Sequence, residues 1–381
     1  MSADAPRATV RTWLAGALPR EVRGPLDLLA RTPGVARVAV LPDVHFSDGV
    51  CVGVVTGATD RVFPDAVGRD IGCGMAAEAF DVPAAPLRES SVAHAVLEGL
   101  GRAVPPVRHG GPASRAALPP PLDPDALSAP FLATVAARDG RVEFATLGRG
   151  NHFLELQADG DDRLWVMVHS GSRAVGPAIH AFHYARARRA DVGLPGLPAD
   201  GDDGRAYLAD LAWALAYAEA SRAAMLDATA GVLADVLGAR PVPGSRFGCL
   251  HNHVRRETHA GETLLVHRKG AVSAAAGERG IVPGSMGTWS FHTEGRGAAA
   301  SMASCSHGAG RVLSRGEARR RVSVATLRRE MGDVAFDPRR ARDLVEEAPS
   351  AYREIGAVLR AQADLVRVVR RLRPVLVHKG T

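Results

Sequence analysis

The chain alternates short β-branched runs with segments of helical periodicity, and this alternation constrains its fold more than any other feature. Because the two kinds of element follow one another irregularly and without an internal repeat, we predict a mixed α/β (α+β) fold with one core, in a single domain over residues 1–381. The predicted helices are 90–104 and 207–237, the predicted strands are 35–41, 50–57, 142–147, 153–157, 164–168, 263–268 and the closing run 374–381, and a loop is expected at Pro42–His45.

Residues 105–130 interrupt this pattern with a segment rich in proline and glycine. The segment is too long for a simple connection between two elements. We therefore predict a mobile surface loop or lid there.

The overall composition is that of an ordinary globular protein, with 46% hydrophobic and 23% charged residues. Disorder, collagen and coiled coil are thereby excluded. No apolar run approaches the roughly 20 residues that a membrane span needs, and the N-terminus lacks the uninterrupted apolar core of a secretory signal. We expect a cytoplasmic protein with no membrane partner. The four cysteines are too few for a disulfide framework, so each is interpreted as a buried thiol or a metal ligand: Cys51, Cys73, Cys249 and Cys305.

The charge balance is basic, with 47 Lys and Arg against 41 Asp and Glu and a net charge of +6. This favours a polyanionic partner, although solubility alone would also explain it. Lys269 and Lys379 are the two lysines of the sequence. A compact ammonium is either needed at these positions, where a planar guanidinium would not serve, or has persisted by chance.

Several of the fourteen histidines lie beside glycine or asparagine at predicted strand ends. Asp70 and Cys73 are three residues apart among glycines, so both can face one point. His152, His169 and His251 would complete a mixed O/N/S cluster large enough for two metal ions that share the thiolate. Each piece alone is more often structural, but five such pieces favour a metal site. Ligand softness favours zinc, and the carboxylate leaves Mn²⁺ open.

Two glycine-rich stretches, 283–287 and 307–311, can offer backbone N–H groups to phosphate oxygens, and tight turns are the alternative interpretation. The second stretch begins with His307, whose imidazole can attack a phosphoryl group and hold it as a phosphoramidate. The sequence has neither a GxxxxGK[ST] loop nor a GxGxxG loop between a strand and a helix. A nucleotide would therefore be bound by a different kind of loop or side-chain arrangement.

Nine motifs, taken together and in order, resemble the RtcB-type RNA ligase family over nearly the whole chain. The motifs are PDVH (42–45), GRDIGCG (68–74), LGRGNHFLE (147–155), VHSGSR (168–173), HNHVRRE (251–257), HRKGAVSA (267–274), IVPGSMG (281–287), SHGAGRVLSR (306–315) and VHKG (377–380).

The resemblance implies an RtcB-like fold with a central metal and nucleotide site. It also implies a GTP-dependent and Mn²⁺-dependent ligase for tRNA splicing or RNA repair. Such an enzyme joins RNA ends carrying a 2′,3′-cyclic phosphate or 3′-phosphate to ends carrying a 5′-hydroxyl. Whether an activating protein is required is left open.

The resemblance also implies roles for individual residues. Cys73 corresponds to a thiolate that bridges two manganese ions, with His152 and His169 on one ion and Asp70 and His251 on the other. His307 corresponds to the histidine that becomes guanylylated. The residues expected around the nucleotide are Asn151, Asn252, Ser285, Gly308, Ala309, Gly310 and Lys379.

Guanine offers an acceptor at O6 and donors at N1 and N2, so Lys379 and the carboxylate of Glu155 together would read it. Tyr352 is the expected stacking aromatic. Arginines in 311–342 and 367–373 are candidates for phosphate contacts, although a charge run is usually a solvated face.

Arg69 and Arg149 depart from the family pattern, which leads us to expect smaller or neutral residues at both positions. Two other functions stay open on the sequence. One is a metal-dependent RNA-end phosphodiesterase or phosphatase without ligation. The other is a non-catalytic, metal-stabilised RNA-binding paralogue.

Overall fold

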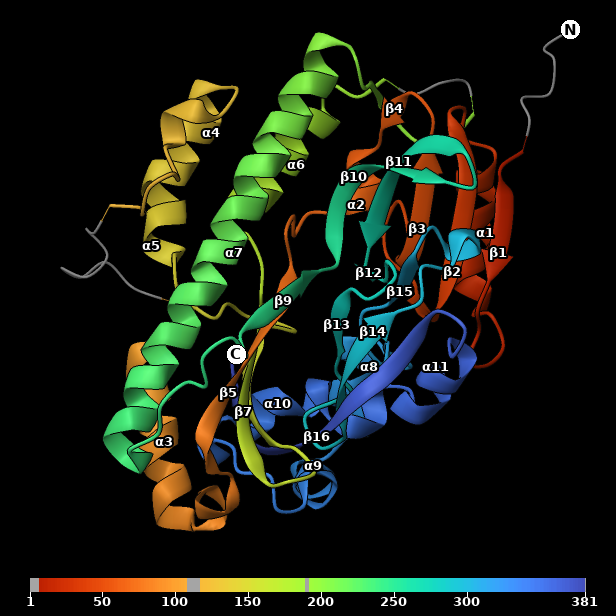
Figure 1. Ribbon diagram of the computed structural model, residues 1–381. Helices are drawn as coiled ribbons and strands as arrows, with labels where there is room; N and C mark the ends of the chain where they lie inside the picture. The colour runs from red at the N-terminus through yellow and green to blue at the C-terminus, as the bar shows by residue number, and fades with distance from the viewer. Residues whose placement is uncertain (1–6, 108–116, 189–191, 381) are drawn as a thin grey trace, which may run out of the picture.

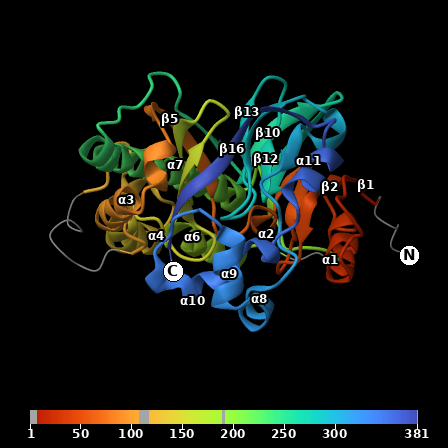
Figure 2. The same ribbon diagram turned by 90° about the horizontal axis from the view of Figure 1, so that it is seen from below.

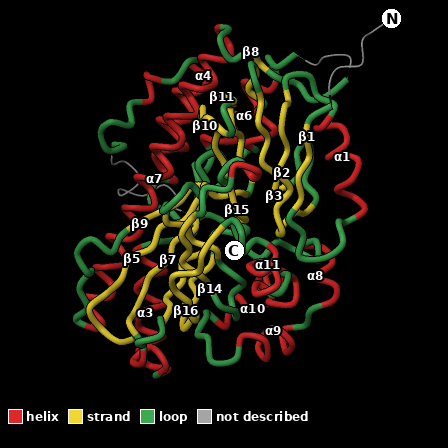
Figure 3. The backbone as a smooth tube through the Cα atoms, turned by 45° about the vertical axis from the view of Figure 1, so that its right-hand side comes forward, coloured by secondary structure: helices red, strands yellow, loops and turns green. Residues whose placement is uncertain are grey.

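The computed structural model describes residues 7–107, 117–188 and 192–380, and it confirms the mixed α/β fold. Two larger sheets lie side by side with helices around them (Figure 1). A short two-stranded ribbon of β12 (Ala271–Ser273) and β15 (Ser304–Ser306) contacts strands of both sheets and lies between them (Figure 3).

The larger sheet is antiparallel throughout. Its order is β13 (Arg279–Val282), β14 (Ser290–Gly295), β16 (Val366–Lys379), β6 (Phe153–Ala158), β7 (Arg163–Ser170), β5 (Gly74–Pro83) and β9 (Phe247–Leu250).

The second sheet is mixed, because β1 and β2 are parallel and the other neighbours are antiparallel. Its order is β1 (Thr9–Thr12), β2 (Val35–His45), β3 (Val52–Ala58), β11 (Glu262–Lys269) and β10 (Asn252–His259). A further small pair joins β4 (Arg61–Val62) to β8 (Leu197–Pro198).

Helix α7 (Asp202–Leu237) is the longest described helix and packs on β5 and β7 of the larger sheet (Figure 1). It ends at Gly238, whose φ of 64° is the left-handed conformation that glycine adopts without steric cost. The other helices are α1 (Arg20–Ala30), α2 (Pro64–Val67), α3 (Ser90–Ala103), α4 (Pro130–Val135), α5 (Arg141–Glu143), α6 (Val175–Tyr184), α8 (Arg315–Arg321), α9 (Val324–Met331), α10 (Ala341–Leu344) and α11 (Ile355–Ala361).

The hydrophobic core lies under these helices. Buried side chains of α3, α7 and the larger sheet form one cluster, which includes Leu100, Leu156 and Leu233. A second cluster joins the smaller sheet to α1, α6 and α7. Figure 2 shows β16 crossing the middle of the molecule, with α3 and β5 on one side of it and β1 and β2 on the other. Helices α8, α9 and α10 lie at the bottom of that view.

The predicted helices at 90–104 and 207–237 and most of the predicted strands are confirmed. The predicted strand 142–147 is wrong: these residues continue the short helix α5 into turns. Polar groups of these residues bind next to α6 and on α7 instead, since Ala174 N donates to the Glu143 carboxylate at 2.8 Å and Ala145 N donates to Ser221 Oγ at 3.1 Å.

Two further boundaries differ from the prediction. The expected loop Pro42–His45 belongs to β2, which has a register irregularity between Val40 and His45. The closing strand begins at Val366, because its first half pairs with β14 and its second half with β6.

Within the predicted loop 105–130, residues 108–116 lie outside the described residues. The described remainder is irregular up to a short 3-10 turn at Pro124–Ala126, with Leu122 and Leu127 buried. None of the described helices combines the length and apolar character that crossing a membrane requires.

Candidate metal and nucleotide site

The antiparallel order of the larger sheet brings distant sequence segments to one edge. Gly74 at the start of β5 pairs with Ser170 at the end of β7 and with Leu250 at the end of β9. Phe153 at the start of β6 pairs with both His169 and Lys379. The residues at or next to these strand ends are therefore brought to the same end of the sheet: Cys73, His152, His169, His251 and Lys379.

Five of the predicted residues form a compact cluster at this edge. The Cys73 Sγ lies 3.2 Å from His169 Nε2 and 3.6 Å from His152 Nε2. His152 Nε2 lies 2.9 Å from an Asp70 carboxylate oxygen, and His169 Nε2 lies 3.3 Å from His251 Nε2. Two ligand groups share the thiol, one with Asp70 and His152 and the other with His169 and His251, and the atoms within each group lie within 4.8 Å of one another. This grouping differs from the ligand pairing that the resemblance implied.

Burial and the neighbouring charges together set the protonation of the cluster. Burial and the neighbouring Asp70 raise the pKa of the Cys73 thiol well above its usual value. Burial and neighbouring imidazoles lower the pKa of His169 and His251 well below the usual value, so both rings are neutral ligands. Burial alone would raise the pKa of Asp70, but His152 outweighs it and lowers the pKa to about 2.

A hydrogen bond orients one of these rings. His169 Nδ1 donates to Asn151 O at 3.1 Å, which leaves the Nε2 lone pair directed at Cys73 and His251. Within the described residues, the buried Nδ1 atoms of His152 and His251 have no hydrogen-bond partner. Once a cation displaces the thiol proton, Cys73, the three imidazoles and the carboxylate form a donor set suited to one or two metal ions.

The loop that carries Asp70 and Cys73 is fixed from two sides. Asn252 Nδ2 donates to Asp70 O at 2.9 Å, and its Oδ1 accepts from Gly270 N at 2.9 Å. From helix α7, the buried Arg222 donates to Gly72 O and Ser170 O, both at 2.8 Å. Both ends of the Asn252 amide are thus occupied by backbone groups.

His307 follows β15 and lies against the metal cluster. Its ring centroid is 4.9 Å from that of His251. Two contacts hold His307 close to His251. Strand β15, which precedes His307, pairs with β12, and Ala271 N at the start of β12 donates to His251 O at 3.1 Å. The β12–β15 ribbon therefore holds His307, the candidate nucleophile, against the candidate metal cluster.

Asp43 of β2 orients the His307 ring. Its buried carboxylate accepts from His307 Nδ1 at 2.6 Å and from His307 N at 3.1 Å. Because a carboxylate can only accept, the proton lies on Nδ1 and the lone pair on Nε2. Gly310 makes this approach possible: its φ is +72°, and a Cβ there would lie 2.4 Å from Asp43 O.

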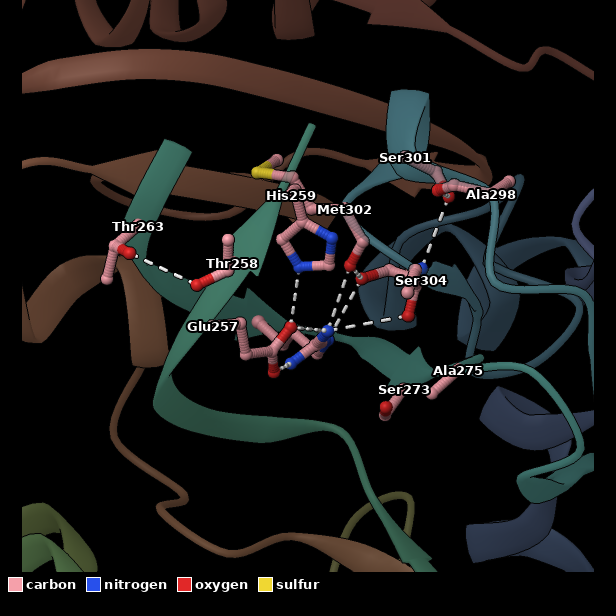
Figure 4. Close-up of polar contacts among 12 residues, drawn as sticks. Glu257, Thr258, His259, Thr263, Ser273, Ala275, Ala298, Ser301, Met302 and Ser304 are labelled. Carbon is pink, nitrogen blue, oxygen red and sulfur yellow. Dashed lines mark hydrogen bonds and ion pairs between the residues drawn. The ribbon is translucent and has the colours of Figure 1, made fainter. Parts of the chain in front are cut away.

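The segment before β15 is strained and held by a buried arginine. Met302 and Ala303 have φ angles of 52° and 44°, a conformation that costs energy for residues other than glycine. Arg268 donates to Ser304 Oγ at 2.9 Å and to Met302 O at 3.0 Å, while Glu257 accepts from its guanidinium at 2.6 and 2.9 Å. Figure 4 shows Glu257, Met302 and Ser304 converging on this contact. The network fixes the backbone that leads to His307.

A cavity of about 610 Å³ opens beside the metal cluster and contains most of the predicted nucleotide residues. Gly308 approaches Pro283 O, so the two glycine-rich stretches lie next to each other on its wall. The predicted residues that line the cavity are Asn151, Glu155, His169, Ser285, His307, Gly308, Ala309, Gly310, Tyr352 and Lys379.

One end of the cavity carries a buried charge network around Lys379. Lys379 Nζ lies 3.1 Å from Glu347 Oε2. Glu347 also accepts from the Tyr352 hydroxyl at 2.6 Å and from Arg311 at 3.0 Å. Burial would raise the pKa of Glu347, but Lys379 and Arg311 outweigh it and lower that pKa. Burial raises the pKa of nearby Glu155 to about 8.

Sequence reasoning missed three residues of the site. Asp43 stands inside the PDVH motif but received no role. Arg222 lies in an alanine-rich stretch of α7 on the helix face with the buried Ala218 and Met225, and a charged residue at that spacing was an available signal. Glu347 carries no such signal, because its partners come from distant segments.

Other predicted features lie outside the cavity. Cys51 and Cys305 are buried in hydrophobic clusters, and Cys73 is the cysteine found in the metal groups of the described residues. Lys269 is buried and donates to Asp48 O at 3.2 Å. Arg69 and Arg149 are exposed.

Comparisons with known proteins find one family over nearly the whole chain. The family model described as tRNA-splicing ligase RtcB matches residues 26–119 and 125–380. The chain is 36% identical to the RNA-splicing ligase RtcB of Escherichia coli strain K12, over 98% of both chains. It is 31% identical to the RNA-splicing ligase RtcB of Mycobacterium tuberculosis, over 92% of this chain and 99% of that protein. The tRNA-splicing ligase RtcB of Pyrococcus abyssi is 29% identical over 68% of this chain and 33% of its own length.

Proposed function

Because this chain belongs to the tRNA-splicing ligase RtcB family, we propose that it joins RNA ends with a 2′,3′-cyclic phosphate or 3′-phosphate to ends with a 5′-hydroxyl. The reaction uses GTP and Mn²⁺ and passes through a guanylylated His307. The observation that carries the proposal is the position of His307, with its ring 4.9 Å from that of His251 and its Nδ1 bonded to Asp43.

The metal residues are Asp70, Cys73, His152, His169 and His251. Two Mn²⁺ ions that share the Cys73 thiolate would neutralise charge that develops on phosphate oxygens. The compact grouping of the five ligands, with Cys73 common to both sets, supports this assignment.

His307 acts as the nucleophile. Its Nε2 lone pair forms a bond to the α-phosphorus of GTP, and the bond from that phosphorus to pyrophosphate breaks. Asp43 keeps the proton on Nδ1 and stabilises the positive charge that the ring acquires. An RNA 3′-phosphate oxygen then takes the GMP, and the ring recovers its lone pair.

In the last step, the 5′-hydroxyl oxygen bonds to the RNA 3′-phosphorus, GMP leaves with its bonding electron pair, and the hydroxyl proton passes to solvent. A cyclic phosphate must first be opened by water to a 3′-phosphate. Residues of the 283–286 and 307–311 stretches line the cavity where these phosphates would lie, and backbone N–H groups of the second stretch would donate to phosphate oxygens.

Guanine selection falls to the end of the cavity around Lys379. The ammonium donates to O6, and the Glu155 carboxylate accepts from N1 and N2. Tyr352 lines the same end and offers a ring for stacking.

The test is incubation with GTP labelled in the α-phosphate, with and without Mn²⁺. The protein should retain label that is acid-labile and base-stable. His307→Ala should retain none, whereas His94→Ala, which alters an exposed histidine of α3, should label as the wild type does.

Ligation is then measured on RNA with cyclic-phosphate and 5′-hydroxyl ends, with and without GTP. Joined product that requires GTP supports the proposal. Opening of the cyclic phosphate without labelling or joining would replace the ligase with a phosphodiesterase.

A further inference from the structure

We propose that Trp289 and Arg371 form a docking surface for a single-stranded segment of the RNA, at the rim of the nucleotide cavity. The inference rests on the proposed function, since it concerns how the RNA substrate reaches the site. Trp289 provides a ring on which a base stacks, and Arg371 provides a cation for the adjoining phosphate.

Trp289 is a large aromatic side chain left exposed to solvent. Its side chain is 41% exposed, although full burial of such a ring is strongly favourable. The Arg371 guanidinium lies 4.7 Å from the centroid of its ring. This cation–π contact holds the guanidinium beside the ring, so the pair presents a stacking surface for a base next to a positive charge for a phosphate.

Arg371 and Arg373 are exposed arginines of β16 without an acidic partner among the described residues, whereas two other arginines of this strand have one. Arg367 is paired with Glu294 and Arg370 with Asp159. Among the described residues, no carboxylate lies within ion-pair distance of Arg371. Its charge is therefore available to a phosphate, whereas the charges of the other two are compensated.

The backbone of Trp289 packs against residues that line the cavity. Pro283, Gly284, Ser285 and Met286 line the cavity. A Cβ on Gly284 would lie 2.3 Å from Thr288 Oγ1 and 2.5 Å from Trp289 O, so the tryptophan backbone packs directly behind the cavity wall. Ser285 N donates to Thr288 Oγ1 at 2.7 Å and fixes this turn.

Strand pairing completes the surface. Arg371 is opposite Phe291, two residues after Trp289, and the strands β14 and β16 run together beside α11 (Figure 1). Val368 and Val369 of β16 are also exposed, at 41% and 46%. A single strand, with exposed bases and one charge per nucleotide, fits an exposed ring beside an uncompensated arginine better than a duplex does, because the bases of a duplex are hidden.

The test measures the affinity of the full chain for a short labelled single-stranded RNA with a 3′-phosphate. GTP is omitted so that no joining occurs. Trp289→Ala and Arg371→Ala should each weaken binding about 10-fold, and Trp289→Phe should retain most of the affinity. Arg371→Ala should also lower the slope of log affinity against log salt by about 0.7.

Two matched variants serve as controls. Phe131→Ala removes an exposed aromatic ring of α4 that is 58% exposed, and Arg205→Ala removes an exposed arginine of α7. Both should bind RNA as the wild type does. Labelling from GTP in the absence of RNA should be unchanged in all variants, because none of these side chains lines the cavity.

Wild-type RNA affinity in both Trp289→Ala and Arg371→Ala would overturn the proposal. Equal losses in the Phe131→Ala control, or an equal loss for fully paired RNA, would do the same. If the wild type takes no label from GTP, the proposed ligase function fails, but the RNA-binding comparison still decides the docking surface. If Trp289→Ala does not fold, Arg371→Ala and Trp289→Phe decide it.

Discussion

Replacing Asp43 by asparagine should nearly stop guanylylation of His307 while the fold and the metal cluster persist. Asp43 is fully buried and accepts two hydrogen bonds from His307, one of them at 2.6 Å from the ring. Asparagine has the same shape but carries an amide group. If its NH₂ faces Nδ1, the imidazole proton is forced onto Nε2, the atom that must attack the phosphorus.

The size of the effect follows from these contacts. Loss of one charge-assisted hydrogen bond costs about 1.5–3 kcal/mol, which corresponds to about 10-fold to 150-fold in rate. An imposed wrong tautomer adds to this, and in a catalytic triad the analogous change lowers the rate about 10⁴-fold. We expect a decrease in the rate of self-labelling between about 100-fold and 10⁴-fold.

The assay is single-turnover labelling with α-labelled GTP, alongside measurements of GTP affinity, bound Mn²⁺ and thermal stability. The GTP affinity and metal content of Asp43→Asn should stay near those of the wild type, because Asp43 belongs to neither metal group. A wild-type labelling rate in a folded Asp43→Asn protein would refute the orienting role. Loss of metal together with labelling would show that the residue acts on the cluster instead.

Three further predictions concern the metal and guanine ends of the site. Cys73→Ala should abolish Mn²⁺ binding and labelling together, because both ligand groups use this sulfur; unchanged metal content by elemental analysis would contradict the bridging role. Lys379→Ala should weaken GTP binding, and Lys379→Arg should not restore it, since a planar guanidinium does not fit the position of the buried ammonium beside Glu347; full affinity of the arginine variant would count against this account. Burial raises the pKa of Glu155 to about 8, so the free protein holds a proton there at neutral pH that guanine binding must release. GTP affinity should therefore rise about tenfold per pH unit from pH 6 to about pH 8 and then level off; calorimetry that finds no proton release, or the same rise in Glu155→Gln, would exclude this carboxylate as the guanine acceptor.

Much of the site could be predicted because its chemistry is carried by residue type and local context. Cys73, His152, His169, His251 and His307 each stand in a glycine-rich or strand-end segment, and an imidazole or thiol there is suited to coordination or attack in almost any fold. The helix at 207–237 and the strand at 164–168 followed from periodicity for the same local reason.

The incorrectly predicted strand at 142–147 shows where local reasoning fails. Its run of β-branched and aromatic residues fits a strand, but no neighbouring strand of the described sheets pairs with it. The polar contacts of Glu143 with Ala174 and of Ala145 with Ser221 hold this part of the chain against α6 and α7 instead. A strand needs a partner for its backbone groups, and that partner is not encoded in the segment itself.

The amino-acid sequence thus determined which side chains have the functional groups for metal coordination, nucleophilic attack or hydrogen bonding to a base, because those capacities belong to the residue types. Only the tertiary structure decided which groups meet. The pairing of Asp70 with His152, the bond from His307 to Asp43 and the contact of Lys379 with Glu347 each join segments that are far apart along the chain. Strand register and burial set these contacts, and burial in turn sets the pKa values on which the chemistry depends.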